Sequence, residues 1–465
     1  MRIKIILLLV GNIIYTSAVM AATGLADELD ELINNSLPNA HVGVLIQEEN
    51  NGKILYTRNA NKYFYPASNI KLFTATAALY FLGTDYQYTT KLAKKGENIY
   101  FIFTGSPSLT INDLDAMVAE LKKKKITVIT GNIIIDDSRF KPPMYSGGVS
   151  NDDFGLEYTA PSSAIIINGN TEPFDFRTTA KIGDLVEINP ATANGVIKIK
   201  NELIIATKDE ATNHCKFNIE IKRNNALELY GCFEKKIDPE IMNLAVTDPF
   251  LYAKKTITNS LDKYKIHLNG NIIKGHTPPE TTTIAINKSE NLQKLLTHML
   301  LVSDNNYAYS IIKQLGYTVT GEGTFTQGMF AAKKILQEHT TLKADQLALS
   351  DGFGSRYDLA TPEQVMILLI NLHQNKEFKP FLFAMLPHMG SLGTLKKRLT
   401  NTELTNKVFA KTGTMHDISA LSGYMQTKSG KIIYFTILIN NFIGDIKKAK
   451  EFEDILLIKV YNSTN

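Results

Sequence analysis

The chain lacks residues and motifs that are typical of several classes of protein. Its 465 residues include no tryptophan and only two cysteines, and 50 basic against 46 acidic residues give a formal charge of +4. A charge this small gives no reason to expect a nucleic-acid partner or a strongly acidic one. The nine histidines show no His-Glu-x-x-His or similar spacing, so neither a metal site nor a cofactor is predicted. The sequence also lacks a Gly-x-Ser-x-Gly elbow and a phosphate-cradling loop.

Long apolar runs are absent except at the N-terminus. There, Arg2 and Lys4 precede an apolar run from Ile5 to Ala18, and small residues follow with a suitable cleavage position after Ala21. The run is shorter than the ~20 residues that a membrane span needs. The pattern predicts a secretory signal peptide, residues 1–21, that is cleaved on export to the periplasm; an uncleaved anchor is the alternative. The sequence leaves peripheral membrane association and homo-oligomer formation open.

The two cysteines, Cys215 and Cys232, flank a predicted β-hairpin. Residues 216–222 and 226–230 alternate apolar and polar side chains about Asn224-Asn225. The cysteines therefore lie near one another at the open end of the hairpin. In an exported protein this arrangement favours a disulfide, and two buried free thiols are the alternative.

The remaining chain is predicted to fold as an α/β protein interrupted by a large insertion. The segment that follows the signal peptide and the C-terminal segment combine helical and strand patterns. Between them lie a mixed α and β region and then, from roughly Glu172 to Ile237, short alternating strands that suggest a small β domain. Within the insertion we predict strands at Thr127–Ile135, Leu185–Ile188, Val196–Ile199 and Leu203–Ala206.

One stretch, Tyr65–Leu79, carries a candidate nucleophile. Pro66 and small polar residues begin a helical pattern whose apolar stripe predicts a buried helix. Ser68 and Lys71 lie three residues apart in its first turn, on one face. A serine hydroxyl is a weak nucleophile until a base takes its proton, and a neutral lysine amine one turn away can be that base.

The Ser-x-x-Lys spacing alone is weak evidence for catalysis. Ser260 and Lys263 have the same spacing on a helix that we interpret as an exposed surface. Two downstream patterns supply partners. Ser303-Asp-Asn305 falls between two helical runs, where a tight connection can aim a hydroxyl and a carboxamide into a cleft. Lys411-Thr-Gly413 ends an apolar strand, whose alternation puts Lys411 and Gly413 on one face and lets a substrate lie against the glycine.

These three patterns, in this order, resemble the penicillin-recognising serine peptidases and β-lactamases. More specifically, the chain resembles the D-alanyl-D-alanine carboxypeptidase/endopeptidase family, the low-molecular-mass class C penicillin-binding proteins. Five further stretches carry the resemblance: Gly105–Leu109, Gly131–Phe140, Thr159–Pro161, Asp351–Arg356 and Gly393–Arg398.

The resemblance implies a transpeptidase/β-lactamase-like α/β sandwich, formed by residues 22–85 and 282–465, with a two-domain insertion. One inserted domain would be α/β, residues 86–168 and 244–281, and the other mostly β, residues 169–243. It implies a serine hydrolase that cuts D-Ala-D-Ala and D-Ala-meso-diaminopimelate bonds in peptidoglycan stem peptides and cross-links. β-Lactam antibiotics are then expected as covalent inhibitors. Ser68 would be acylated and Lys71 would accept its proton. Ser303 would relay a proton to the leaving D-alanine, and Asn305 would hold the substrate amide and Lys71.

The same resemblance assigns substrate contacts to the strand at Lys411. Lys411 would meet the terminal carboxylate of the peptide, assisted by the hydroxyls of Thr412 and Thr414, with Gly413 between them. The oxyanion hole would consist of the backbone N–H groups of Ser68 and Thr414. One such donor is typically worth about 2.7–4 kcal/mol in the transition state.

A side pocket for the free amino acid end of diaminopimelate is also implied by the resemblance. Asp153 and Tyr158 match its acidic and aromatic residues, and Arg356, Met415 and His416 match the rest. An acid facing the ammonium and an arginine facing the carboxylate suit a zwitterion. Surface charges without a shared ligand are the alternative for Asp153 and Arg356.

Three departures from the family pattern leave side-chain selectivity open. Gly148-Val149 stands where tryptophan is common, the Asp351–Arg356 stretch is one residue short, and His416 replaces a small polar residue or glutamine. A β-lactamase is the nearest rival function, but the chain has no Glu-x-x-Leu-Asn segment to activate water, so slow deacylation is expected. A catalytically idle penicillin-binding sensor or scaffold is the other rival, although it would not need Lys71.

Overall fold

The computed structural model describes residues 24–192 and 195–464, so the signal peptide predicted at residues 1–21 lies outside it. The chain divides into two compact units. The first comprises Met1–Tyr80, Leu296–Ser303 and Lys333–Asn465, and the second comprises Phe81–Leu295 and Asp304–Ala332. No described helix has the length and apolar character needed to cross a bilayer. The predicted further division of the insertion into two domains stays a prediction.

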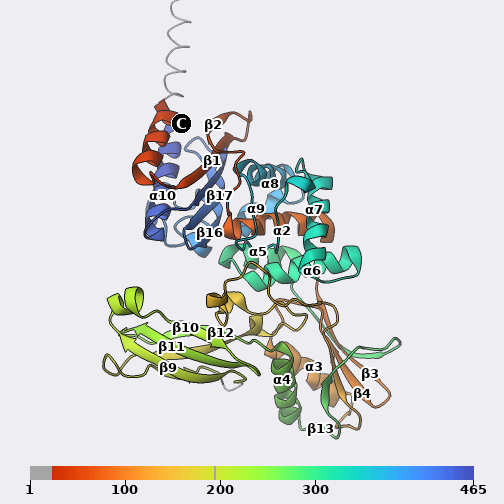
Figure 1. Ribbon diagram of the computed structural model, residues 1–465. Helices are drawn as coiled ribbons and strands as arrows, with labels where there is room; N and C mark the ends of the chain where they lie inside the picture. Colours follow the sequence, from red (N-terminus) through yellow and green to blue (C-terminus); the bar gives the residue numbers. More distant parts are fainter. Residues whose placement is uncertain (1–23, 193–194, 465) are drawn as a thin grey trace, which may run out of the picture. The chain divides into compact units, whose positions relative to one another are not determined.

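The first unit is built on an antiparallel five-stranded sheet (Figure 1). Its strands, in spatial order, are β16 (Val408–Met415), β17 (Ile418–Gln426), β18 (Ile432–Asn440), β1 (His41–Glu48) and β2 (Ile54–Arg58). The β17 and β18 strands are buried over nearly their whole length. Such strands need cover on both faces, which explains why their sequences are almost continuously apolar.

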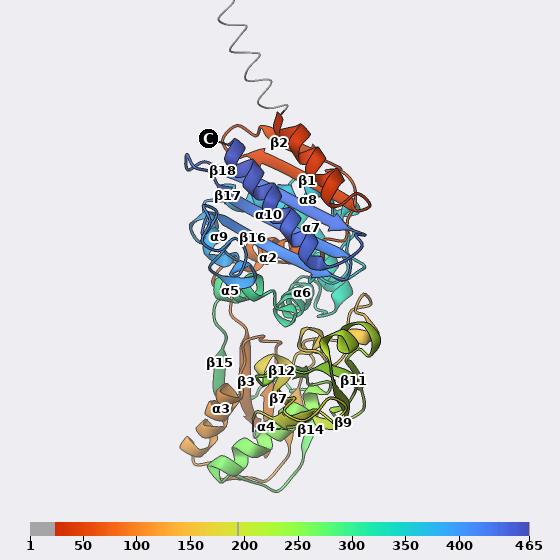
Figure 2. The same ribbon diagram turned by 90° about the vertical axis from the view of Figure 1, so that its left-hand side faces the viewer.

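Helices cover both faces of this sheet. On one face, α10 (Ile446–Ser463) and a helical segment of residues 24–36 lie across the strands (Figure 2), and they pack against Leu421 and Met425. On the other face lie α2 (Ile70–Leu82) and α8 (Pro362–Gln374). Further helices of or bordering the first unit are α5 (Leu292–Val302), α7 (Phe325–His339) and α9 (Lys379–Met385). The predicted α/β sandwich is confirmed.

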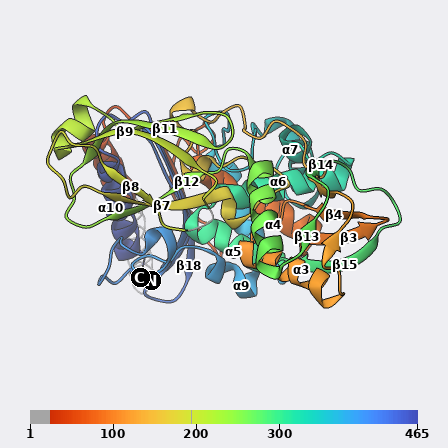
Figure 3. The same ribbon diagram turned by 90° about the horizontal axis from the view of Figure 1, so that it is seen from below.

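The second unit contains a five-stranded mixed sheet with two helices. Its strands, in spatial order, are β14 (Ile272–Lys274), β6 (Ile133–Asp136), β4 (Asn98–Ile102), β3 (Thr89–Lys95) and β15 (Thr282–Lys288). The helices α3 (Ile111–Lys123) and α4 (Pro249–Tyr264) lie side by side (Figure 3). Each begins at a side-chain cap, since Thr110 accepts from the Asp113 N–H and Asp248 accepts from the Leu251 N–H.

The single strand predicted at Thr127–Ile135 is wrong. The segment forms two short strands, β5 (Val128–Ile129), which pairs with β13 (His267–Leu268), and β6, which joins the five-stranded sheet. Gly131 lies between them, against the Glu97 carbonyl, where an added Cβ would approach to 2.7 Å. The chain therefore changes sheet at a glycine that allows close backbone contact.

Two three-stranded sheets complete the second unit. One contains β12 (Glu240–Ala245), β7 (Thr171–Arg177) and β8 (Glu187–Pro190), and the other contains β10 (Asn218–Ile221), β11 (Ala226–Glu234) and β9 (Lys198–Ala206). The two strands predicted at Val196–Ile199 and Leu203–Ala206 are one strand, β9, because it pairs without interruption with β11. The helix α6 (Asn305–Thr320) also belongs to this unit.

The predicted hairpin and disulfide are confirmed. The β10 and β11 strands pair antiparallel, and Cys215 is bonded to Cys232 across a separation of 17 residues. Cys232 lies within β11, whereas Cys215 precedes β10. The bond therefore closes the open end of the hairpin.

Replacement of both cysteines by serine should lower the free energy of unfolding of the second unit by about 2–4 kcal/mol, because the unfolded chain regains loop entropy. Chemical denaturation of the variant and of the oxidised protein would measure this difference. The environment of Ser68 should not change, since that residue lies in the first unit. Equal stability of the two proteins would contradict the stabilising role.

Candidate active site

Ser68 lies in a tight turn at the start of α2. Ala67–Asn69 form one turn of 3-10 helix before the α-helix begins at Ile70, and Ala67 has a φ of 46°. That left-handed conformation is costly for a non-glycine residue and is typical of functional sites. The buried helix predicted here is confirmed, because residues 70–79 are all buried.

Lys71 brings its amine to the Ser68 hydroxyl. Its Nζ lies 2.9 Å from Ser68 Oγ and donates to the Phe353 carbonyl at 3.0 Å. The lysine side chain is fully buried. Burial disfavours the charged form of an amine. The geometry therefore places a proton acceptor within direct reach of a hydroxyl nucleophile.

The loop that supplies the Phe353 carbonyl is held by two buried carboxyl groups. Asp351 accepts from the backbone N–H groups of Phe353 and Gly354, both at 3.1 Å. Asp358 accepts from the N–H groups of Ser350 and Ser355 at 2.6 and 2.9 Å. Burial, and then the neighbouring Asp351, raise the pKa of Asp358 well above its ordinary value. A proton held between the two carboxyl groups removes their repulsion and fixes the loop.

Lys411 forms the second half of the site. Its Nζ donates to Ser303 Oγ at 2.9 Å and to the Thr412 carbonyl at 2.8 Å. Ser303 has a φ of 63° at the connection between α5 and α6. Burial and the charge of Lys71 lower the pKa of Lys411 well below its ordinary value. The two lysines thus interact electrostatically, and adding a proton to one disfavours a proton on the other.

A cavity of about 750 Å³ in the first unit exposes these hydroxyl groups. Ser68, Ser303, Thr412 and Thr414 contribute to its wall, and the Thr394 and Thr412 hydroxyls lie 2.7 Å apart. The charged wall residues are Lys397, Arg398, Lys447, Lys450, Glu451 and Asp454. Cavities of this size hold small ligands. The sequence motifs missed every wall residue on α10, because nothing in that amphipathic helix marks it as part of a site.

Gly413 has a structural role that the sequence interpretation missed. A Cβ at this position would lie 2.7 Å from the Pro66 carbonyl oxygen and 3.1 Å from the Ala67 Cβ. The glycine therefore allows β16 to pack directly against the turn that carries Ser68. Only a residue without a side chain permits this approach.

Asn305, Asp153 and Tyr158 lie in the second unit. Asn305 begins α6 and donates to the Tyr158 carbonyl at 2.7 Å. The Tyr158 hydroxyl donates to Asp153 Oδ1 at 2.8 Å. Burial and the nearby carboxylate raise the pKa of Tyr158. The structure thus brings together the acidic and aromatic residues predicted for the side pocket.

Arg356, Met415 and His416 lie in the first unit. Arg356 donates to the His416 carbonyl at 3.3 Å, and Met415 ends β16. The His416 ring itself is exposed and lies 2.7 Å from the Asp417 carboxylate. That this group and the Asp153–Tyr158 pair share one ligand stays a prediction.

The Ser260–Lys263 repeat of the spacing has a structural explanation. Both side chains bond to Asp115 on α3, and Ser260 is buried. The interpretation of this helix as an exposed surface is therefore wrong at Ser260. The Asp115 carboxylate binds both the Ser260 hydroxyl and the Lys263 amine. Lys263 is therefore not available as a base for Ser260.

Comparisons with known proteins agree with this geometry. The sequence profile of the D-Ala-D-Ala carboxypeptidase 3 (S13) family matches residues 25–458. The chain is 28% identical over 421 residues to D-alanyl-D-alanine carboxypeptidase DacB of Haemophilus influenzae, covering 88% of this chain and 87% of that protein. It is 28% identical over 449 residues to a D-alanyl-D-alanine carboxypeptidase of Actinomadura sp., covering 91% and 82%.

Solved structures show the same relationship. The crystal structure of penicillin binding protein 4 (dacB) from Haemophilus influenzae superimposes with a TM-score of 0.84 at 28% identity, covering 93% of this chain and 99% of that one. A structure of the same protein complexed with a β-lactam has a TM-score of 0.79 at 27% identity. The predicted family resemblance and the transpeptidase-like fold are confirmed.

Gly354→Ala should destabilise the first unit more than Gly444→Ala does, because only the first substitution adds a steric clash to the backbone strain. A Cβ at Gly354, whose φ is 105°, would lie 1.9 Å from the Ala67 carbonyl oxygen. Gly444 is the matched control, because its φ is 114° and an added Cβ meets nothing within 4 Å. The steric clash should add roughly 1–3 kcal/mol to the loss of unfolding free energy. Equal losses in chemical denaturation would contradict the close packing.

Proposed function

The chain belongs to the D-Ala-D-Ala carboxypeptidase 3 (S13) family, and from this premise we propose that it cleaves D-Ala-D-Ala and D-Ala-meso-diaminopimelate bonds in peptidoglycan. The first cut trims a stem peptide, and the second opens a cross-link. The observation that carries the proposal is the 2.9 Å approach of Lys71 Nζ to Ser68 Oγ. Both cuts use the same acyl-enzyme, since the two bonds differ only in the leaving group on the C-terminal side of the D-alanine.

Acylation begins when Ser68 Oγ attacks the scissile carbonyl and its proton passes to the neutral Lys71 amine. The oxygen–carbon bond forms, and the carbon–nitrogen bond of the tetrahedral intermediate then breaks. Ser303, already hydrogen-bonded to Lys411, relays a proton to the leaving amine. The backbone N–H groups of Ser68 and Thr414 are assigned to the oxyanion, and Asn305 to the substrate amide. Water then hydrolyses the ester and restores the serine.

Substrate recognition rests on hydroxyl and cationic groups. Lys411, Thr412 and Thr414 suit the terminal carboxylate of a peptide, with Gly413 leaving room beside the strand. Cations on the cavity wall, such as Lys397 and Lys447, favour the approach of acidic stem peptides.

The side pocket is assigned to the zwitterionic end of diaminopimelate. Asp153 and Tyr158 would hold its ammonium, and Arg356, Met415 and His416 would surround its carboxylate. Peptidoglycan lies outside the cytoplasmic membrane, which agrees with the predicted export to the periplasm. The pairing of opposite charges supports this assignment.

Lys71→Ala should reduce both D-alanine release from a diacyl peptide ending in D-Ala-D-Ala and acylation by benzylpenicillin, by about 10²–10⁴-fold. Ser68→Ala should abolish both. Lys263→Ala is the matched control, since it alters the second Ser-x-x-Lys pair and should leave both rates unchanged. Product analysis by mass spectrometry measures release, and the mass of the intact protein measures acylation. Full activity of the Lys71 variant would refute its role as base.

The same assays separate the rival functions. A carboxypeptidase releases D-alanine and keeps its penicillin adduct for a long time. A β-lactamase regenerates free enzyme rapidly and hydrolyses nitrocefin with many turnovers. An idle sensor forms the adduct but releases no D-alanine. Cross-linked dimer supplied as substrate tests the endopeptidase activity directly.

Acylation by benzylpenicillin should slow as the pH falls. Burial and the charge of Lys71 lower the pKa of Lys411, so the coupled lysine pair resists holding two protons, and a single shared proton leaves one amine able to act as base. Below that lowered pKa both amines are protonated and no base remains, so the rate constant should fall about tenfold per pH unit. Stopped-flow or quenched acylation from about pH 9 to about pH 5 tests this. Circular dichroism at each pH controls for unfolding, and a flat profile would contradict the mechanism.

A further inference from the structure

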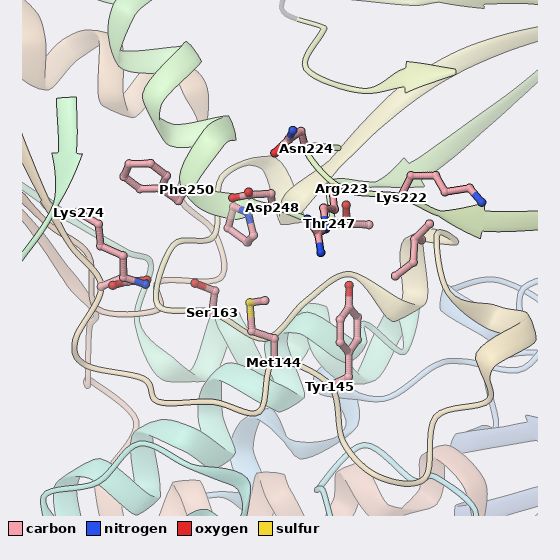
Figure 4. Close-up of a pocket in the computed structure, with 13 residues that line it drawn as sticks. Met144, Tyr145, Ser163, Lys222, Arg223, Asn224, Thr247, Asp248, Phe250 and Lys274 are labelled. Atoms are coloured by element: carbon pink, nitrogen blue, oxygen red, sulfur yellow. The ribbon is translucent and has the colours of Figure 1, made fainter. Parts of the chain in front are cut away.

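A second cavity, of about 390 Å³, lies wholly within the second unit. Its wall includes Tyr145, Ser163, Arg223, Asp248 and Phe250 (Figure 4). In Figure 4 the Tyr145 ring directs its hydroxyl toward the hairpin turn that carries Arg223. None of these residues belongs to the site assigned to acylation.

Hydrogen-bond donors without protein acceptors face this cavity. Among the described residues, no group pairs with the guanidinium of Arg223, an exposed residue of the hairpin turn, or accepts from the hydroxyl of the half-buried Tyr145. Burial raises the pKa of Tyr145 to about 12, so the hydroxyl keeps its proton and can donate. Ser163 Oγ accepts from the Ile165 N–H at 3.1 Å, and its own proton remains available. A guanidinium and two hydroxyls of this kind suit a carboxylate.

The other charges at the cavity narrow the choice of ligand. Lys274 is neutralised by Asp137 at 2.7 Å, and Lys222 contacts the carboxylates of Glu220 and Glu228. Asp248 uses Oδ1 to cap α4, which leaves a carboxylate on the wall. A multiply charged phosphate would be repelled by this group, whereas an amine beside the ligand carboxylate would be attracted to it. The wall therefore suits a zwitterion.

Apolar surface completes the cavity. The side chains of Met144, Ile221 and Phe250 form part of its wall. They can cover the methyl and methylene groups of a short peptide, and the volume lies in the range of small-ligand sites. Mixed apolar walls with a few directed polar groups are typical of binding sites.

The segment that supplies Tyr145 is fixed in place. Lys313, fully buried in α6, donates to the carbonyls of Lys141, Pro143 and Ser162 at 3.1, 2.8 and 3.0 Å. One side chain thereby holds both ends of the segment. All three donors of the ammonium group are used, so the frame of the cavity is set before any ligand arrives.

The same segment connects the cavity to the predicted side pocket. The Tyr145 ring packs on Phe154 with ring centroids 4.7 Å apart. Phe154 directly follows Asp153, the residue assigned to the diaminopimelate ammonium. A ligand on Tyr145 therefore contacts the segment that carries Asp153.

We propose that this cavity is a second peptide site, which takes a stem-peptide segment with a free carboxylate and a free amine. Arg223 and Tyr145 bind the carboxylate, and Asp248 faces the amine. This inference rests on the proposed function, which supplies the identity of the peptide. A second contact on the same polymer raises the effective concentration of the scissile bond at Ser68. The gain applies to polymeric or cross-linked substrate and not to a small diacyl peptide.

The test uses full-length mature protein with Ser68 blocked by benzylpenicillin, so that acylation by the peptide is excluded, and the Arg223→Ala variant separates binding in this cavity from binding in the predicted diaminopimelate pocket. The probe is the tripeptide L-Ala-γ-D-Glu-meso-diaminopimelate, titrated by calorimetry or ligand-observed NMR. Arg223→Ala should raise the dissociation constant by about tenfold or more, because it removes a charge-assisted contact. Tyr145→Phe should raise it severalfold and keeps the packing on Phe154. Arg177→Ala is the control, since Arg177 is an exposed arginine paired with Asp175 and does not line the cavity.

Several results would overturn the proposal. These are no saturable binding to the blocked enzyme, equal binding by Arg223→Ala and the control, and displacement of the tripeptide by inorganic phosphate at equal concentration. A kinetic measurement distinguishes failure of the second-site proposal from failure of the proposed function. Arg223→Ala should release D-alanine from a diacyl peptide at the unaltered rate and should lose severalfold in kcat/KM on cross-linked peptidoglycan. If the unaltered enzyme releases no D-alanine at all, the proposed function fails instead.

Discussion

Two lysine amines lie in one buried site of the first unit, and the loop and strand around them hold them in place. Lys71 and Lys411 are both fully buried, and desolvation opposes a full charge on each. Each amine is compensated by a backbone carbonyl, from Phe353 and Thr412, and by a serine hydroxyl. The site can hold these groups only as long as the loop and the strand that supply the carbonyls stay fixed.

Local backbone strain and close contacts provide that rigidity. Ala67 and Ser303 both adopt positive φ angles, each at or next to a serine that we assign to catalysis. Such strain persists only when the surroundings determine the conformation. The surroundings here are the loop held by Asp351 and Asp358 and the β16 strand at Gly413. Asp351 and Asp358 therefore help to position the lysine pair, because they fix the Phe353 carbonyl that accepts from Lys71.

The sequence predicts the structure best where a motif or an apolar pattern follows from a simple physical rule. The β17 and β18 strands are almost continuously apolar, and Ser68, Ser303 and Lys411 stand in motifs whose order is specific. Contacts between distant segments leave no such pattern. Nothing in the sequence says that Lys71 meets the Phe353 carbonyl, or that Gly413 faces Pro66, because these contacts depend on how loops pack.

Errors arise where local pattern and tertiary context differ. The apolar residues of β9 are interrupted at Asn201-Glu202, which predicts two strands, although pairing with β11 carries the strand through. The isoleucines of Thr127–Ile135 predict one continuous strand, although Gly131 turns the chain into another sheet. Polar neighbours predict an exposed Ser260, although Asp115 satisfies its hydroxyl in a buried position. In each case a partner distant in sequence decides the outcome.

The tight packing of glycines around Ser68 limits which substitutions the proposed active site can accept. A methyl group at either Gly354 or Gly413 would meet the backbone of the Pro66–Ala67 turn. Substitutions there would disturb Ser68, the proposed nucleophile, and any ligand bound to it. If a β-lactam acylates Ser68 as proposed, substitutions that weaken its binding are expected at side chains on the cavity wall, such as Thr394 and Thr414. Those residues are in the positions where the natural peptide is expected, so drug resistance and peptidase activity are expected to oppose each other.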